Sequence, residues 1–224
     1  MFIGHFGIGF GAKAAAPRAS LGTLFLAAQF LDLLWAALLL AGIERVRIEP
    51  GATAVSPLVA EHMPFSHSLL AVLGWALLLA LVYRFLRRDD RGAWVIGLAV
   101  LSHWLLDAIV HRPDLPLHPG SAVLAGLTLW DSLPATLAVE LSLFLIGAWL
   151  YVRTTRPRDR TGTWALAGLL GMLLLIYAGN LFGPQPPNVA AIAWVGQLQW
   201  LLVLWAYWVD AHRCNRAAAR SPIA

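Results

Sequence analysis

Histidine and aspartate side chains recur within residues 62–111, inside a chain that is otherwise mostly apolar. His103 and Asp107 lie four residues apart in a long apolar run, and on a helix this spacing places both side chains on one face. An imidazole and a carboxylate are costly to hold in lipid unless something compensates them. Both groups are common ligands of divalent metals. The pair therefore predicts a metal or catalytic site within the membrane.

A second polar stretch lies just before another apolar run. It contains His62, Ser66 and His67. We expect His67 to lie near the depth of His103, because it enters the membrane from the opposite surface at the start of its run. We expect His62, Ser66 and Ser102 to surround the ligands and to support them, with His62 nearer the rim.

The bulk composition indicates an integral membrane protein. Of the 224 residues, 59% are hydrophobic and 12% are charged, whereas about a quarter of a soluble domain is charged. We expect one integral membrane domain over residues 1–224, whose partner is the lipid bilayer. The net charge of +4 is interpreted first as a topology signal, and no nucleic-acid partner is expected. Cys214 is the only cysteine, so no internal disulfide is possible.

Six apolar runs are long enough to cross a bilayer, which takes about 20 residues. We place them at residues 21–43, 66–86, 92–110, 132–152, 162–182 and 189–209. The expected fold class is an all-α, polytopic helical membrane bundle of six transmembrane helices with a short N-terminal half-helix. The metal-site motifs fall within residues 1–118, and residues 162–209 form a C-terminal helix pair.

Basic residues mark alternate loops. They lie before the first span, between the second and third, between the fourth and fifth, and after the sixth: Lys13, Arg18, Arg84, Arg87, Arg88, Arg91, Arg153, Arg156, Arg158, Arg160, Arg213, Arg216 and Arg220. By the positive-inside rule these loops face the cytoplasm. We therefore expect the N- and C-terminal ends of a multi-pass protein to lie on the cytoplasmic side.

The helical rise of about 1.5 Å per residue gives each polar residue a depth. Counted from the cytoplasmic ends of their spans, Asp32 and His103 lie roughly 16 Å into the bilayer and Asp107 roughly 22 Å. A short helix over residues 5–16 that turns back into the membrane would carry His5 about 17 Å up, beside Asp32. Five side chains are therefore expected to converge between the midplane and the outer leaflet: His5, Asp32, His67, His103 and Asp107.

These residue types favour zinc, which binds imidazole and carboxylate and in catalytic sites keeps one position for water. We expect His67, His103 and Asp107 to hold the metal, with His5 and Asp32 completing the site or neighbouring it. A free carboxylate, Asp32 or Glu140 in the fourth span, is the candidate general base.

The ordered motifs resemble a bacterial family of predicted inner-membrane metal-dependent hydrolases, that of the LexA-binding, inner-membrane-associated hydrolase. The family shows an N-terminal histidine, an acidic motif in an early span, a His-Arg-x-x-Thr-His-Ser motif and a later Ser-His-x-x-x-Asp. His5 matches the first. Residues 62–68 match the third, with methionine for arginine and serine for threonine, and residues 102–107 match the last. Of the acidic Pro-Asp-x-Asp motif, only Asp32 is present.

The resemblance covers roughly the first 120 residues. It implies a metal-dependent hydrolase of the bacterial cytoplasmic (inner) membrane. With a site near the outer leaflet, the expected substrate is a lipid-linked or periplasmic small molecule with an ester, amide or phosphoester bond.

Two other classes of function use the same residues. A transporter or permease-like protein would bind or relay a proton or cation through them, and a scaffold would use them only to join helices. Three ligand atoms facing a water-filled pocket would favour the enzyme. A polar path to both membrane faces would favour transport, and dry polar pairs would favour the scaffold.

Overall fold

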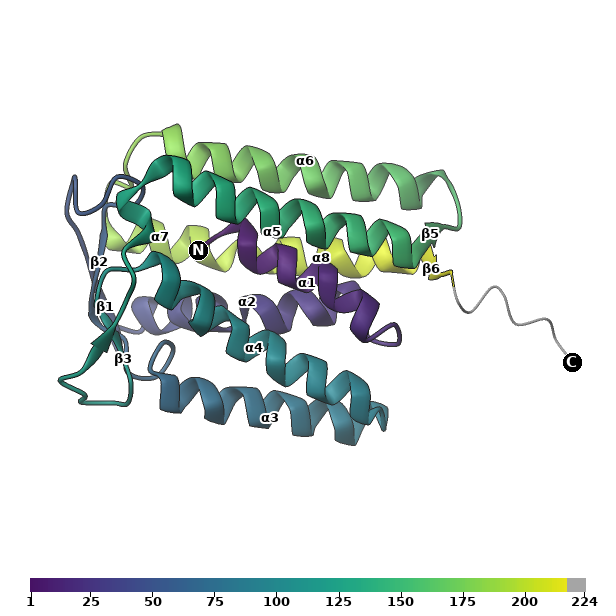
Figure 1. Cartoon of the computed structure of the whole chain (residues 1–224), viewed down its shortest axis with the longest axis horizontal. Helices are drawn as coiled ribbons and strands as arrows, with labels where there is room; N and C mark the ends of the chain where they lie inside the picture. Colours follow the sequence, from purple (N-terminus) through teal and green to yellow (C-terminus); the bar gives the residue numbers. More distant parts are fainter. Residues whose placement is uncertain (217–224) are drawn as a thin grey trace, which may run out of the picture.

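The computed structural model describes residues 1–216, so Arg220 lies outside the described residues. The chain is predominantly helical, as expected (Figure 1). Its helices are α1 (Ile3–Ala15), α2 (Leu21–Leu40), α3 (Leu69–Arg87), α4 (Asp90–Val110), η1 (Leu129–Asp131), α5 (Leu133–Thr154), α6 (Arg160–Phe182), α7 (Val189–Gln197) and α8 (Gln199–Ala211). Its short strands are β1 (Arg45–Ile48), β2 (Leu58–His62), β3 (Leu115–Pro116), β4 (Leu124–Ala125), β5 (Thr155–Pro157) and β6 (Arg213–Asn215).

Within residues 1–216, six helical segments are long and apolar enough to cross a membrane, which confirms a multi-pass membrane protein. They are α2, α3, α4, α5, α6 and the combined segment of α7 and α8, Val189–Ala211. The strand pairs β1–β2 and β3–β4 lie at one end of the bundle, and β5–β6 lies at the other (Figure 1).

Polar side chains set where the spanning helices begin. Each accepts a hydrogen bond from a backbone N–H in the first turn of its helix, which is the preferred N-cap arrangement. These caps are Ser20, Ser68, Asp89, Ser132, Asp159 and Asn188. The predicted start of the second span at residue 66 is therefore too early, because Ser68 caps the helix and places His67 in the turn before it.

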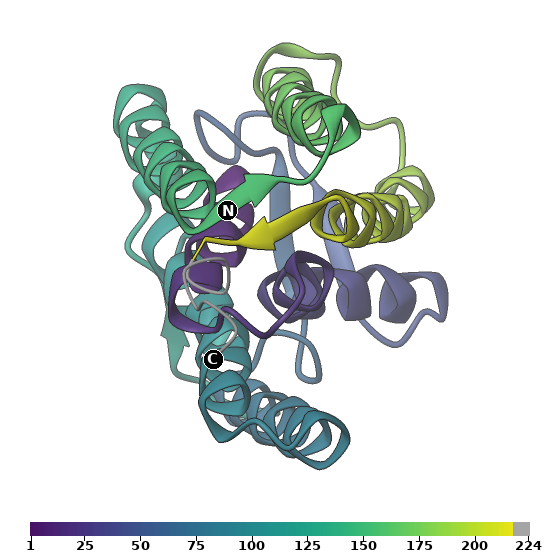
Figure 2. The same cartoon turned by 90° about the vertical axis from the view of Figure 1, so that its right-hand side faces the viewer.

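Helix α1 is the expected half-helix, and it lies inside the bundle rather than on its surface (Figure 2). It packs on α2, α4 and α5. The contact with α5 is close because both helices present glycine: a Cβ at Gly7 would lie 2.5 Å from the Leu143 carbonyl oxygen. Ile3, Phe6 and Phe10 are completely buried. The turn that follows α1 lies at the β5–β6 end of the bundle, where Asn215 donates a hydrogen bond to the Pro17 carbonyl. Met1, at the other end of α1, lies within the bundle (Figure 1).

A buried polar network fastens α1 at that end. Lys13 Nζ lies 2.8 Å from Asp210 Oδ2 in α8 and 2.8 Å from the Ala19 carbonyl oxygen. Tyr151 in α5 donates its hydroxyl hydrogen to Asp210 Oδ1 at 2.9 Å. Three helices are thereby joined through one carboxylate, and the orientation of α1 in the bundle is fixed.

Candidate metal centre

The five residues expected to converge do lie together. His5 comes from α1, Asp32 from α2, His67 from the turn before α3, and His103 and Asp107 from α4. Two overlapping groups have ligand atoms within 4.8 Å of one another and could hold a metal ion: His5, His103 and Asp107, and Asp32, His67 and His103. All are buried except Asp32, whose side chain is 20% exposed.

Short nitrogen–oxygen separations link the two histidines to the two carboxylates. The distances from His103 Nε2 are 3.1 Å to Asp107 Oδ2 and 3.5 Å to Asp32 Oδ1. Those from His67 Nε2 are 3.5 and 3.7 Å to the same two oxygens. Ligands around a tetrahedral zinc ion, at bond lengths of roughly 2.0–2.1 Å, are about 3.3 Å apart. These nitrogen–oxygen separations are close to those between the ligands of one metal ion.

The tautomer of His103 is fixed by the neighbouring helix. Its Nδ1 lies 2.7 Å from the carbonyl oxygen of Ala28, which can only accept, so Nδ1 carries the hydrogen. Nε2 is then an acceptor facing carboxylate oxygens, and it is buried without a hydrogen-bond partner within residues 1–216. A buried acceptor without a donor is costly, and a cation at the centre would satisfy it.

The tautomer of His67 is set in the same way, by a different series of hydrogen bonds. Ser66 Oγ donates its hydrogen to Glu44 Oε2 and lies 2.7 Å from His67 Nδ1. The hydroxyl must therefore accept from Nδ1–H, and in the neutral imidazole Nε2 is then the unprotonated nitrogen that faces the cluster. The backbone of His67 is held as well, because Trp104 in α4 donates its indole N–H to the His67 carbonyl at 2.9 Å.

Sequence reasoning missed Glu44, which directly follows the first predicted span. The carboxylate is buried and also accepts the backbone N–H groups of Phe65 and Ser66, each at 2.8 Å. A glutamate in a charged loop gives no sign of this role, because its burial depends on how the segment between α2 and α3 folds over the bundle. Supporting groups of this kind orient a histidine ligand and raise its basicity.

His5 contacts the cluster from the other side of Asp107. Its Nε2 lies 3.0 Å from Asp107 Oδ1, and its ring stacks on that of His103 with centroids 3.7 Å apart. The Met1 amine also lies 2.6 Å from Asp107 Oδ1. One oxygen of Asp107 thus faces His5 and the amine, and the other faces His67 and His103.

No protein family, curated protein or solved structure matches the chain. The geometry of the site therefore carries the functional argument.

Three other expected site residues, Glu140, Ser102 and His62, make no hydrogen bond or ion pair with the ligand atoms of the cluster within residues 1–216. Glu140 accepts the backbone N–H groups of Phe2 at 2.9 Å and Gly4 at 3.3 Å, both through Oε2. It thereby compensates the N-terminus of α1, where a negative charge is favourable. Ser102 donates its hydroxyl hydrogen to the Ala99 carbonyl of its own helix. His62 is exposed on β2, so support of the ligands comes from Ser66 rather than from these two residues.

A small cavity of about 100 Å³ opens onto the cluster. Asp32, His67 and Asp107 lie in its wall together with Trp35 and Trp130. A water molecule needs roughly 10–15 Å³ of such space, so the cavity admits several waters or a small polar group. The cluster is therefore accessible from this cavity.

Proposed function

We propose that the chain is a membrane-embedded metal-dependent hydrolase that cleaves an ester, amide or phosphoester bond. The observation that carries the proposal is the pair of histidines whose Nδ1 hydrogens are held elsewhere. As neutral imidazoles, His67 and His103 both direct an unprotonated Nε2 toward Asp32 and Asp107. Imidazole and carboxylate in this arrangement suit zinc.

We assign His67, His103 and Asp107 as the ligands of the zinc ion. A bound divalent cation supplies Lewis acidity toward a carbonyl or phosphoryl oxygen and acidifies water. Asp32 is the one partly exposed member of the cluster and borders the small cavity. Its carboxylate is placed to accept a proton from water as general base.

His5 and Glu140 act through other groups in this proposal. His5 orients Asp107 by its contact with Oδ1. Glu140 holds the first turn of α1, the helix that carries His5. Its alternative role as general base would require Oε1, since both of its hydrogen bonds are made through Oε2.

The resemblance to the inner-membrane family implies a bacterial inner-membrane location, and the distribution of basic residues supports an orientation with the cluster nearer the outer face. The described Arg and Lys residues other than Arg45, Arg47 and Arg112 lie at the bundle end that holds the α1–α2 turn, the α3–α4 turn and β5–β6. The small cavity is lined by Val46, Leu58 and Ala60 of the opposite end. Substrate would thus enter from the outer side.

The rival functions fit the packing less well. A transport path would have to pass Phe6, Phe10 and Phe25, which are fully buried, with Phe25 in edge-to-face contact with the other two rings. A scaffold would pair its polar groups off in a dry interior, yet His5 Nδ1 has no hydrogen-bond partner within residues 1–216 and the cluster borders the small cavity.

A hydrolysis screen tests the proposal. Detergent-purified protein is given fluorogenic carboxyl esters, amides and phosphoesters in three states: as purified, after chelation, and after zinc is restored. We expect turnover of at least one bond class that is lost on chelation, restored by zinc, and absent in His103→Ala. Turnover that survives both chelation and His103→Ala would contradict the assignment.

A further inference from the structure

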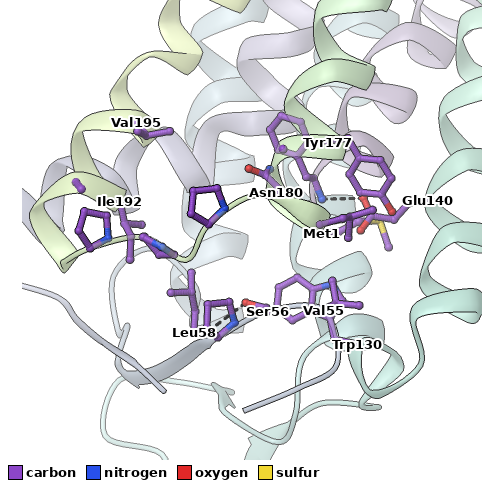
Figure 3. A pocket seen from close by; sticks show the side chains of 18 residues that line it. Met1, Val55, Ser56, Leu58, Trp130, Glu140, Tyr177, Asn180, Ile192 and Val195 are labelled. Atoms are coloured by element: carbon purple, nitrogen blue, oxygen red, sulfur yellow. Dashed lines mark hydrogen bonds between the residues drawn. The ribbon is translucent and has the colours of Figure 1, made fainter. Parts of the chain in front are cut away.

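A larger cavity of about 420 Å³ lies beside the small one. Its volume is within the range of roughly 300–1,000 Å³ that is usual for ligand pockets. It is bounded by the N-terminal end of α1, by α5, α6 and α7, and by the loops around Pro57 and Pro186 (Figure 3). Met1, Leu58 and Trp130 line both cavities. These three side chains are therefore the partition between the larger cavity and the metal centre.

The wall of this cavity is mainly apolar, with two polar groups at its inner end. Tyr177 is 4% exposed, and its hydroxyl has no hydrogen-bond partner within residues 1–216. Glu140 directs Oε2 to the backbone of α1, so Oε1 receives no hydrogen bond from the described part of the chain. Figure 3 shows both side chains beside Met1. A ligand group that both donates and accepts would satisfy the two together.

The opposite side of the cavity reaches the surface that faces lipid. Ile192 and Val195 of α7 line it, and Val195 is 61% exposed within the last membrane-spanning segment (Figure 3). Asn180, near the end of α6, is also exposed and lines the cavity. A hydrocarbon chain can therefore enter sideways from the bilayer between these helices, without crossing water.

We propose that this cavity binds the acyl chain of a membrane amphiphile, and that Glu140 and Tyr177 recognise an amide at the base of the chain. The amide N–H donates to Glu140 Oε1, and its carbonyl oxygen accepts from the Tyr177 hydroxyl. The head of the amphiphile then lies toward the partition and the metal centre. That this amphiphile is the substrate rests on the proposed hydrolase function, whereas its binding does not.

Photolabelling tests the binding. The full chain, in vesicles of phosphatidylglycerol and phosphatidylethanolamine, is exposed to two amphiphiles that share one diazirine-bearing acyl chain. One is amide-linked and the other ester-linked. Labelled residues are mapped by mass spectrometry in the wild type, in Tyr177→Phe, which removes the hydroxyl, and in Ile192→Trp, which fills the cavity. Leu98→Trp is the matched control, because it fills an apolar groove of similar size between α3 and α4.

We expect the amide probe to label α6 and α7 at the cavity wall more strongly than the ester probe. Tyr177→Phe should weaken this labelling about tenfold, the effect of a hydrogen bond worth about 1.4 kcal/mol. Ile192→Trp should abolish it, and Leu98→Trp should leave it unchanged. Equal labelling by both probes, or wall labelling that persists in Ile192→Trp, would overturn the proposal.

Metal content measured on the same samples separates this proposal from the hydrolase function. Neither Tyr177→Phe nor Ile192→Trp touches a cluster residue, so both should retain the metal of the wild type. Specific labelling of a chain that holds no metal would contradict the hydrolase and leave the acyl site standing. Metal without specific labelling would contradict the acyl site alone.

Discussion

Ser66 Oγ lies 2.7 Å from Nδ1 of His67 and is the only group between that imidazole and the buried Glu44 carboxylate in the described structure. The order of donors is set by the carboxylate, which can only accept when ionised. Glu44 thus determines which nitrogen of His67 faces the cluster, although it belongs to the segment after α2 and not to a cluster element.

Removing this support should weaken metal binding without unfolding the chain. Loss of a group that orients a ligand typically costs 10–100-fold in metal affinity, so we expect about that loss in Glu44→Gln and Ser66→Ala. Competition with a chromophoric chelator measures the affinity. Glu49→Gln, at an exposed glutamate just after β1, is the control and should bind metal as the wild type does. An unchanged affinity in Ser66→Ala would show that His67 is not oriented through this contact.

The close approach of α1 and α5 should depend on Gly7. A methyl group there would meet the backbone of Leu143 at 2.5 Å, which cannot move as a flexible side chain would. We expect Gly7→Ala to destabilise the protein by about 1–3 kcal/mol, the usual cost of overpacking. Thermal unfolding in detergent measures it. Gly74→Ala is the control, because a Cβ at Gly74 would meet nothing within 4 Å; an equal loss in both variants would refute the packing argument.

Lys13 and Asp210 should behave as a coupled pair. Both are largely buried, and their charged atoms lie 2.8 Å apart. Lys13→Met leaves the carboxylate without its cation, which costs about 3–5 kcal/mol at buried pairs. The double variant Lys13→Met/Asp210→Leu should recover much of that loss, because no charge is then left alone. Unfolding measurements on the two single variants and the double variant give the coupling free energy, and a value near zero would show that the pair does not fasten α1.

The convergence of the five cluster residues could be predicted because it depends on few quantities. Span order and helical rise alone give the depths of Asp32, His103 and Asp107. The depth of His5 follows once α1 is taken as a helix that turns back into the membrane. These inputs need no side-chain detail, so the positions of the helices and of the cluster were accessible to sequence reasoning.

The groups that refine the site depend on tertiary packing and were missed for that reason. Lys13 was interpreted as a topology signal, although in the structure it is also one half of a buried ion pair. His62 and Ser66 were both expected to support the ligands, with His62 nearer the rim, but the strand turns His62 outward and the loop buries Ser66 against Glu44. The two side chains differ in burial because His62 lies on β2 and Ser66 lies in the turn that follows it.

Metal content is the most direct test of the central claim. Mass spectrometry on detergent-purified protein should find near-stoichiometric zinc in the wild type. The zinc should be lost in His103→Ala and Asp107→Ala while helical circular dichroism is retained. His118→Ala, at an exposed histidine outside the cluster, should keep the metal. A wild-type protein that holds no metal after growth in zinc-supplemented medium would contradict the account.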